Sequence, residues 1–352
     1  MGQESKSISR RRWGIIKFYV IGWTLSFIFL YIVRGVGTTE NGALQFGLVD
    51  SMIISLTLGP IFGAVSGYAQ ILMEERIYKR ISIQRLLILR LVYATLFLVL
   101  LTICAYGIYQ LYFGTNIDLI TFAFDDGSFA IYFYVLMVDL FMATVRQVNL
   151  MLGDNNLGRL LRGDFYTPRE EERIFMFLDL QSSTQLAEKL GHVKYSTLIQ
   201  DCFNDLAVVV QNEAQIYQYV GDEVVLTWPI EAGLRNHNCI KAYFNFMQQL
   251  SSKESYYQEN YDCLPFFKAG MNLGVVTITE VGKYKKEIAY HGDTVNTAAR
   301  IQGKCNELGE PLLISAFLKD KLGQNEWRFG RHGNISLKGK EQQVPIYSVS
   351  VN

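Results

Sequence analysis

Four long apolar runs dominate the first 160 residues, and only short polar breaks separate them. Each run is near or above the roughly 20 residues that a helix needs to cross the hydrocarbon core of a bilayer. We therefore predict a bundle of four transmembrane helices, in contact with lipid, over residues 1–152. The spans are expected at residues 15–33, 48–73, 86–113 and 129–152. A cleaved signal peptide fits the first run poorly, because no Ala-x-Ala-like site follows Val33.

Basic residues orient these spans, because cytoplasmic loops of membrane proteins carry an excess of Lys and Arg. The basic residues before the first run and between the second and third runs are Arg10, Arg11, Arg12, Arg76, Lys79, Arg80, Arg85 and Arg90. The loop after the first run has Arg34 alone, and the loop after the third has Asp118, Asp125 and Asp126. Both termini are therefore predicted to lie in the cytoplasm, and the chain in the inner or plasma membrane.

One carboxylate, Asp139, falls near the middle of the fourth run. An ionised group there is costly and usually marks a functional contact or a watery cavity. Arg146 follows seven residues later on about the same helix face, so a structural ion pair is an equally good interpretation. The bundle is compatible with a sensor for an unknown ligand or partner, and equally with a plain anchor and dimerisation device.

After about residue 160 the hydrophobic pattern becomes that of a soluble α/β domain. Strands are expected near residues 173–179, 215–220, 223–228, 266–279 and 285–290. Helices are expected near residues 184–211, 235–251 and 294–307. This strand–helix–strand–strand–helix–strand order predicts a ferredoxin-like domain over residues 173–352.

A cytoplasmic linker, residues 153–172, would join the two predicted domains. Its glycines argue against one rigid helix, whereas Leu157, Leu160 and Leu161 have amphipathic helical spacing. Pro168 would end any such helix before the first strand. The segment is therefore either a mobile linker or an element that couples the bundle to the soluble domain.

Charge and cysteine content exclude some classes of function. Lys+Arg and Asp+Glu are equal at 33 each, so no whole-chain charge points to nucleic acid. The five cysteines are too scattered for a zinc motif or a disulfide framework. They are predicted to be reduced structural residues, and they are Cys104, Cys202, Cys239, Cys263 and Cys305.

Two aspartates stand at the ends of predicted strands. Asp179 ends a short apolar run, and Gly221-Asp222 joins two β-rich runs as a tight hairpin. Carboxylates in these places on neighbouring strands would converge on one point at the edge of a sheet. Two hard oxygen ligands of this kind suit Mg²⁺ or Mn²⁺.

These motifs resemble the catalytic domain of the class III nucleotidyl cyclases, which make cyclic AMP or cyclic GMP. The resemblance continues through Gly292-Asp-Thr-Val-Asn296-Thr-Ala-Ala-Arg300 and Leu337-Lys338-Gly-Lys-Glu, and it covers roughly residues 170–350. Together with the apolar runs, it predicts a four-span α-helical bundle followed by an α/β ferredoxin-like cyclase domain. It also implies a membrane-bound adenylate cyclase that converts ATP to cyclic AMP and pyrophosphate.

The resemblance assigns a two-metal site. Two Mg²⁺ or Mn²⁺ ions would activate the ribose 3′-hydroxyl and hold the leaving phosphates. By motif match the metal ligands are Asp179 and Asp222, with the Leu180 carbonyl as a third oxygen. Alone, either aspartate would be interpreted as a helix cap or a turn residue.

The phosphate-binding residues follow in the same way. Ser182, Ser183 and Thr184 open the next helix, so their backbone N–H groups would face metal-bound phosphates. A plain N-cap would use the same residues. Lys338 matches the lysine of the family that binds the terminal phosphates, although Leu-Lys-Gly-Lys is also a generic loop sequence.

Two further residues match catalytic positions on a helix. Asn296 and Arg300 are four apart and hence share one helix face. In the family the Asn orients the ribose, and the Arg stabilises charge on the transferring phosphoryl group. The family builds each site from two chains, so a chain with one cyclase domain implies a homodimer with two equal sites.

The base-selecting positions depart from the family pattern. Adenylate-specific members have Lys with Asp or Thr where this chain has Gln218 and Ala289, and the Glu and Cys of guanylate-specific members are also absent. A Gln amide can donate to adenine N1 and accept from the N6 amino group. A rotated amide could bind guanine, so ATP is the expected substrate and GTP stays open.

Three rival interpretations remain at this stage. One is a guanylate or mixed-specificity cyclase. Another is a catalytically weak membrane receptor that uses the fold for dimerisation, which the retention of both carboxylates, Asn296 and Arg300 disfavours. A diguanylate cyclase is disfavoured because Val220-Gly-Asp-Glu-Val stands in place of its Gly-Gly-Asp/Glu-Glu-Phe signature.

Overall fold

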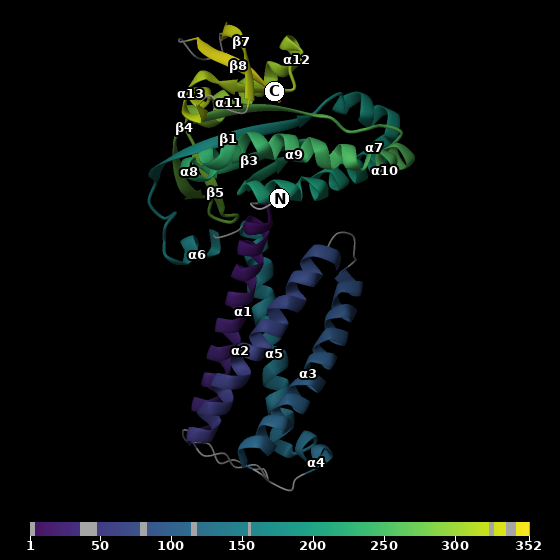
Figure 1. Ribbon diagram of the computed structural model, residues 1–352, viewed down its shortest axis with the longest axis vertical. Coiled ribbons are helices and arrows are strands. Elements are labelled where there is room, and N and C mark those ends of the chain that lie inside the picture. Colours follow the sequence, from purple (N-terminus) through teal and green to yellow (C-terminus); the bar gives the residue numbers. More distant parts are fainter. Residues whose placement is uncertain are drawn as a thin grey trace. The chain divides into compact units, whose positions relative to one another are not determined.

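The computed structural model describes residues 4–35, 48–77, 83–113, 118–153, 156–323, 327–335 and 343–351 (Figure 1). The chain forms two compact units. The helical unit comprises Ser9–Leu150, and the α/β unit comprises Met151–Asn352 together with Met1–Ile8.

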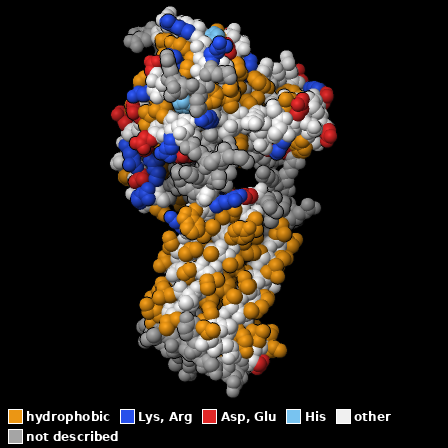
Figure 2. Space-filling view, in the orientation of Figure 1, with side chains coloured by type: hydrophobic (Ala, Val, Ile, Leu, Met, Phe, Trp, Pro, Cys, Tyr) orange, Lys and Arg blue, Asp and Glu red, His pale blue; other side chains and the backbone are white. Residues whose placement is uncertain are grey.

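Long apolar helices make up the helical unit. They are α1 (Glu4–Gly35), α2 (Leu48–Leu72), α3 (Ile83–Phe113) and α5 (Asp126–Leu152), with a π-helical turn (Met73–Ile77) after α2 and a short α4 (Leu119–Ala123) before α5. Among the described residues, these four helices are long and apolar enough to cross a membrane, as the hydrophobic runs predicted. Figure 2 shows hydrophobic side chains covering the sides of this unit, where Leu25 and Leu91 are more than half exposed.

Aromatic side chains fill the centre of the helical unit. The ring centroids of Trp23 and Phe97 lie 5.4 Å apart, and those of Phe62 and Phe97 lie 5.2 Å apart. Trp23 and Phe62 are completely buried. The aromatic centre of the unit and its outer surface are thus both apolar, as expected for helices that contact lipid.

Glycines at every fourth position of α2 bring its backbone against α1. A Cβ atom on Gly63 would lie 2.4 Å from the Cα atom of Val20, and Gly59 and Gly67 meet Thr24 and Ile16 in the same way. Small residues four apart are the usual means by which membrane helices approach closely. The α1–α2 contact therefore depends on the absence of side chains at these positions.

A buried cluster of polar groups joins α5 to the π-helical turn that follows α2. Arg146 donates two hydrogen bonds to the Glu74 carboxylate, at 2.7 and 2.8 Å, and Arg11 donates a third at 3.2 Å. The Glu74 side chain is 6% exposed. Asp139, the carboxylate singled out in the fourth run, is also buried.

The first half of the α/β unit has the predicted ferredoxin-like order, which is confirmed. Its elements are β1 (Arg169–Leu180), α7 (Ser183–Asp205), β2 (Gln215–Val220), β3 (Glu223–Pro229), α9 (Asn238–Ser252) and β4 (Phe267–Val281). The strands are antiparallel in the order β2-β3-β1-β4. Shorter helices flank them: α6 (Asn156–Leu161), α8 (Ile230–Leu234) and α10 (Glu254–Tyr261).

The second half extends the sheet. It contains β5 (Glu287–His291), α11 (Asp293–Gly303), α12 (Cys305–Leu308), β6 (Leu312–Ser315), α13 (Ala316–Leu322), β7 (Trp327–Ile335) and β8 (Val344–Val351). Strand β6 runs parallel to β4 and continues the order as β4-β6-β8-β7, while β5 pairs with β4 as a hairpin. The sheet is therefore mixed.

Alternation along β1 separates the two faces of the sheet. Ile174, Met176 and Leu178 belong to the large core that includes residues of α7 and α9. Phe175 and Phe177 belong to a smaller core that includes residues of α11 and β5. Because alternate side chains of a strand point to opposite faces, the other odd-numbered residues of β1 lie on the α11 face.

Candidate active site

The two predicted metal ligands lie on neighbouring strands at one edge of the sheet. Asp179, near the end of β1, pairs with Glu223 of β3, and Asp222 immediately precedes Glu223 in the β2–β3 turn. Gly221 has φ +63°, which lets the chain reverse there. The expected convergence of the two carboxylates is therefore present in the fold.

The electrostatics of this edge favour a cation. Burial and then the charge of Asp222 raise the pKa of Asp179, while a hydrogen bond from Gln302 of α11 opposes them. Burial and then the charges of Asp179 and Asp222 raise the pKa of Glu223 to about 7. A carboxyl group whose pKa is raised by burial and by neighbouring carboxylates is stabilised in its charged form by a bound metal ion.

Two residues near the carboxylates were not predicted from the sequence. Glu223 follows Asp222 directly, and its position in the hairpin could have indicated it. Tyr195 of α7 is near enough to Ser183 and Asp222 to hydrogen-bond to both, and burial followed by the charge of Asp222 raises its pKa to about 12. Its place sixteen residues after Asp179, on a separate helix, gives no local sequence signal.

The donor set fits Mg²⁺ or Mn²⁺. Among the described residues, no group of three His, Cys, Asp or Glu side chains is arranged to hold a metal ion. The predicted set needs only two such side chains, because Leu180 would contribute its backbone carbonyl, and hard oxygen donors suit these ions. The proposed ligands of Mg²⁺ or Mn²⁺ are therefore still Asp179, Asp222 and the Leu180 carbonyl.

Helix α7 begins at Ser183, as predicted. Ser182 adopts a left-handed backbone conformation, φ 58°, and its side chain makes no capping hydrogen bond. The interpretation of Ser182 as a plain N-cap therefore finds no support. The first-turn N–H groups, which include those of Ser183 and Thr184, have no carbonyl partner within an α-helix and can bind an anion.

Asn296 and Arg300 lie on α11, on the face opposite its buried face. Thr294, Thr297 and Ile301 are buried against the sheet. Their spacing of three and four residues places Asn296 and Arg300 on the outer face of the helix. Asn296 is exposed and Arg300 is half-buried. Asn296 and Arg300 thus share the outer face of α11, which faces away from the sheet that carries Asp179 and Asp222.

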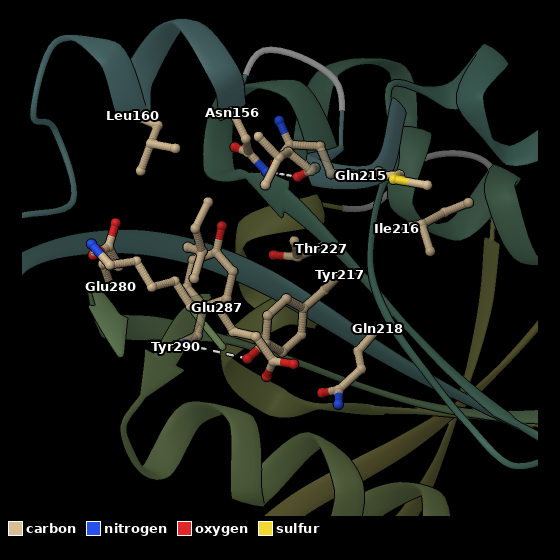
Figure 3. A pocket seen from close by; sticks show the side chains of 14 residues that line it. Asn156, Leu160, Gln215, Ile216, Tyr217, Gln218, Thr227, Glu280, Glu287 and Tyr290 are labelled. Atoms are coloured by element: carbon tan, nitrogen blue, oxygen red, sulfur yellow. Dashed lines mark hydrogen bonds and ion pairs between the residues drawn. The ribbon is translucent and has the colours of Figure 1, made fainter. Parts of the chain in front are cut away.

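Gln218 lines a cavity of about 280 Å³ beside β2 and β5 (Figure 3). Strand β2 has a β-bulge between Ile216 and Gln218, so Tyr217 is an extra residue and it joins the α11-face core. Ile288 and Tyr290 of β5 also line this cavity, whereas Ala289 between them does not. The two predicted base-selecting residues therefore lie on strands that do not pair with each other, although Tyr217 of β2 contacts Tyr290 of β5, and they do not line one cavity together. Lys338, the remaining predicted residue, is outside the described residues.

The fold and this arrangement define a cyclase catalytic domain. The family model described as adenylate and guanylate cyclase catalytic domain matches residues 165–350, which is more than half of the chain. The chain belongs to this family. Members generally use divalent metal ions, which agrees with the paired carboxylates at the sheet edge.

Individual relatives of this chain are adenylate or guanylate cyclases. Adenylate cyclase 2 of Rhizobium meliloti (strain 1021) is 34% identical over 208 residues, which are 58% of this chain and 57% of the relative. Adenylate cyclase 1 of the same organism is 25% identical over 51% of this chain and 27% of its own length. Receptor-type guanylate cyclase gcy-10 of Caenorhabditis elegans is 23% identical over 58% of this chain and 19% of its own. The chain thus covers little more than half of the first relative and about a quarter of the second.

A solved structure supports the fold. A bacterial light-regulated adenylyl cyclase superposes with a TM-score of 0.55 at 19% identity, over 65% of this chain and 67% of that chain. At this identity the likeness concerns the fold alone.

Proposed function

We propose that this chain is a membrane-bound adenylate cyclase that converts ATP to cyclic AMP and pyrophosphate. The observation that carries the proposal is the convergence of Asp179 and Asp222 at one sheet edge, where burial and mutual repulsion favour a bound cation. The 34% identity to Adenylate cyclase 2 supports adenylate over guanylate chemistry.

The chain's own groups would divide the work of the reaction. Asp179, Asp222 and the Leu180 carbonyl hold two Mg²⁺ or Mn²⁺ ions, which supply activation of the 3′-hydroxyl and neutralisation of the phosphates. The first turn of α7 directs backbone N–H groups towards the phosphates, and Lys338 binds the terminal ones. Arg300 stabilises the charge that develops on the transferring phosphoryl group, and Asn296 orients the ribose.

The site would be shared between two chains. Asn296 and Arg300 lie on the outer face of α11, away from the carboxylates of their own chain. A second copy that docks against this face would receive both side chains at its own metal edge. A head-to-tail homodimer then has two equal sites, and a monomer is inactive.

Gln218 would select the base. Its amide can satisfy both N1 and N6 of adenine, whereas guanine requires the amide to rotate. The similarity to a guanylate cyclase is lower, 23%, which favours ATP over GTP. A guanylate or mixed-specificity enzyme is the second candidate, because Ala289 provides no charged partner for either base.

The four apolar helices would anchor the enzyme in the inner or plasma membrane. Large apolar side chains cover the sides of the helical unit (Figure 2), which is unfavourable in water and favourable in lipid. The Lys/Arg distribution favours cytoplasmic termini, and with them a catalytic domain in the compartment that contains ATP.

Product formation from ATP and GTP by the purified full-length protein, with Mg²⁺ and with Mn²⁺, tests the proposal. We expect cyclic AMP with the higher kcat/KM. A higher kcat/KM for GTP would overturn the adenylate assignment, and neither product would indicate a catalytically silent receptor. Gln218→Glu should shift preference towards GTP, because a carboxylate accepts from guanine N1–H and N2–H and repels adenine N1. Gln200→Glu, which adds the same charge at an exposed position of α7, is the control.

A further inference from the structure

Arg173 is almost completely buried, at 1% exposure, in β1 on the α11 face of the sheet. A buried guanidinium is tolerated only where several groups compensate its charge and satisfy its donors. Arg173 donates to Glu171 at 3.1 Å and to the Thr227 hydroxyl at 3.1 Å, and its remaining Nη donates to the Gln215 side-chain oxygen. The planar fork of one arginine therefore holds groups from β1, β2 and β3 together.

The same guanidinium also contacts β5. Its central carbon lies 5.0 Å from the ring centroid of Tyr290. The Tyr290 ring meets the Tyr217 ring edge-on at 4.9 Å, and the Tyr290 N–H donates to the Tyr217 hydroxyl at 3.4 Å. Figure 3 shows this bond beside the cavity that Gln218 lines. Arg173 thus contacts side chains of both β2 and β5, the strands that carry the two base-selecting positions.

Apart from the contacts of its neighbours on β2, few features of the fold fix the position of Gln218. It is exposed, and the bulge at Tyr217 interrupts the regular pairing of β2 with β3 immediately before it. Bulges re-aim side chains and weaken the local ladder. On one side of the bulge, Gln215 is held by Arg173, and Tyr217 itself is held through Tyr290. The direction of Gln218 therefore depends on contacts that lead back to Arg173.

The network also reaches the linker. Glu171 binds Arg173 through Oε2 and binds Arg159 of α6 through Oε1. The Arg159 guanidinium lies 4.6 Å from the ring centroid of the fully buried Phe165. The Phe165 carbonyl accepts a hydrogen bond from the Glu280 N–H of β4 at 2.9 Å. Helix α6, which we call the linker helix, is therefore joined to β2 and β5, the strands that carry Gln218 and Ala289, by a continuous series of polar and aromatic contacts.

We propose that Arg173 is a positioning residue for base selection, and that Glu171 and Arg159 make the position of Gln218 depend on the linker helix. This inference rests on the proposed cyclase function and on the role of Gln218 in it. Arg173 itself is buried beneath these strands and acts only through them.

Cutting the network between Arg173 and β2 provides the first test. Gln215→Met removes the acceptor that Arg173 uses on β2, and Gln215→Glu keeps it. We expect Gln215→Met to reduce the ratio of kcat/KM for ATP to that for GTP by about tenfold, or ~1.4 kcal/mol, through KM and not kcat. Gln215→Glu should retain the wild-type ratio. An unchanged ratio in Gln215→Met, or an equal loss of kcat for both nucleotides, would overturn the proposal.

A double-mutant cycle tests whether the effect passes through Gln218. Gln218→Met removes the amide that reads the base, so Gln215→Met should cause no further change of the ratio in that background. Independent effects of the two substitutions on the ratio would be additive, which contradicts positioning through Gln218.

The contact between Arg159 and Glu171 can be tested with a matched control, because a second arginine lies nearby on the chain. Arg159→Gln breaks the bond to Glu171, whereas Arg162→Gln removes an arginine that is 67% exposed and pairs only weakly, at 3.4 Å, with Asp164. We expect Arg159→Gln to shift the ATP-to-GTP ratio in the same direction as Gln215→Met, and Arg162→Gln to leave it unchanged. If Arg159→Gln and Arg162→Gln had the same effect on the ATP-to-GTP ratio, the proposed dependence of Gln218 on the linker helix would be refuted.

A readout that needs no turnover separates this inference from the proposed function. Amide hydrogen exchange of residues 215–220 and 287–291 should be faster in Gln215→Met and in Arg159→Gln than in wild type, without nucleotide. Unchanged exchange in both variants overturns the network even if the protein is a cyclase. Faster exchange in a protein that converts neither ATP nor GTP refutes the proposed function and with it the role in base selection.

Discussion

Inactivating the two halves of the proposed site in different chains should restore activity when the chains are mixed. Asp222→Asn removes a carboxylate from the sheet edge, and Arg300→Ala removes a guanidinium from the outer face of α11. If each site takes its carboxylates from one chain and its α11 residues from the other, every homodimer of either variant has two damaged sites. A mixed dimer has one site with both defects and one site with neither.

The expected magnitudes follow from these roles. A missing charge-stabilising donor typically costs about 10²–10³ in kcat, which sets the loss in Arg300→Ala. A metal ion contributes several kcal/mol, and ~4 kcal/mol is about a thousandfold, which sets the loss in Asp222→Asn. With random pairing about half of the dimers are mixed and half of their sites are intact, so the mixture should reach about a quarter of wild-type activity.

The assay is cyclic AMP formation by co-expressed variants that carry two different tags. Tandem purification isolates the mixed dimers, whose activity should be about half of wild type, because one of two equal sites is intact. Co-expression of Asp179→Asn with Asp222→Asn is the matched control, since both defects are on the metal side and no intact site can form. Mixed dimers of Asp222→Asn and Arg300→Ala that make no cyclic nucleotide would refute the shared site, and so would recovery in the control pair.

Three further predictions concern the bundle and the metal. Gly63→Ala should lower the free energy of unfolding of the helical unit in detergent by about 1–3 kcal/mol, because the added methyl group meets the backbone at Val20. Gly107→Ala, where nothing lies within 4 Å, should raise it by about 0.5–1 kcal/mol, and equal effects would contradict the packing argument. A chain that starts at Met151 should show specific activity that rises steeply with protein concentration, because the bundle no longer keeps two chains together; constant activity on dilution would show that the bundle is not needed for pairing. Chelation should abolish turnover and added Mn²⁺ or Mg²⁺ should restore it, without a change in circular dichroism; turnover that persists in excess chelator would exclude the two-metal assignment.

Periodicity explains what could be predicted from the sequence. The four long apolar helices are visible in the sequence because their outward-facing and core-facing positions are both apolar, so the runs are uninterrupted. The buried run from Ile174 to Leu178 is equally clear, and it places Asp179 at the end of a central strand. Motif spacing then located Asn296 and Arg300 on one face of α11, although which way that face points depends on how the helix packs.

Long-range contacts explain what could not be predicted. Arg173 resembles the polar start of a strand, and its burial depends on Gln215 and Thr227, which lie 42 and 54 residues away. The bulge at Tyr217 inserts one residue into a strand whose alternation looks regular in the sequence. Strands β6, β7 and β8 were not among the predicted elements; β6 is only four residues long, and β7 pairs with β8 through a register shift between Arg331 and Asn334.

The glycine contacts between α2 and α1 matter for biosynthesis. The nearest atoms to a Cβ on Gly59, Gly63 or Gly67 all belong to α1, so these contacts join two helices that are adjacent in the sequence. In the proposed membrane placement, α1 and α2 can therefore associate as soon as both have left the ribosome, while the cyclase domain is still untranslated. A bulky substitution at Gly63 would then act first on newly made protein, and its effect would be a lower yield of inserted chains before any effect on the enzyme.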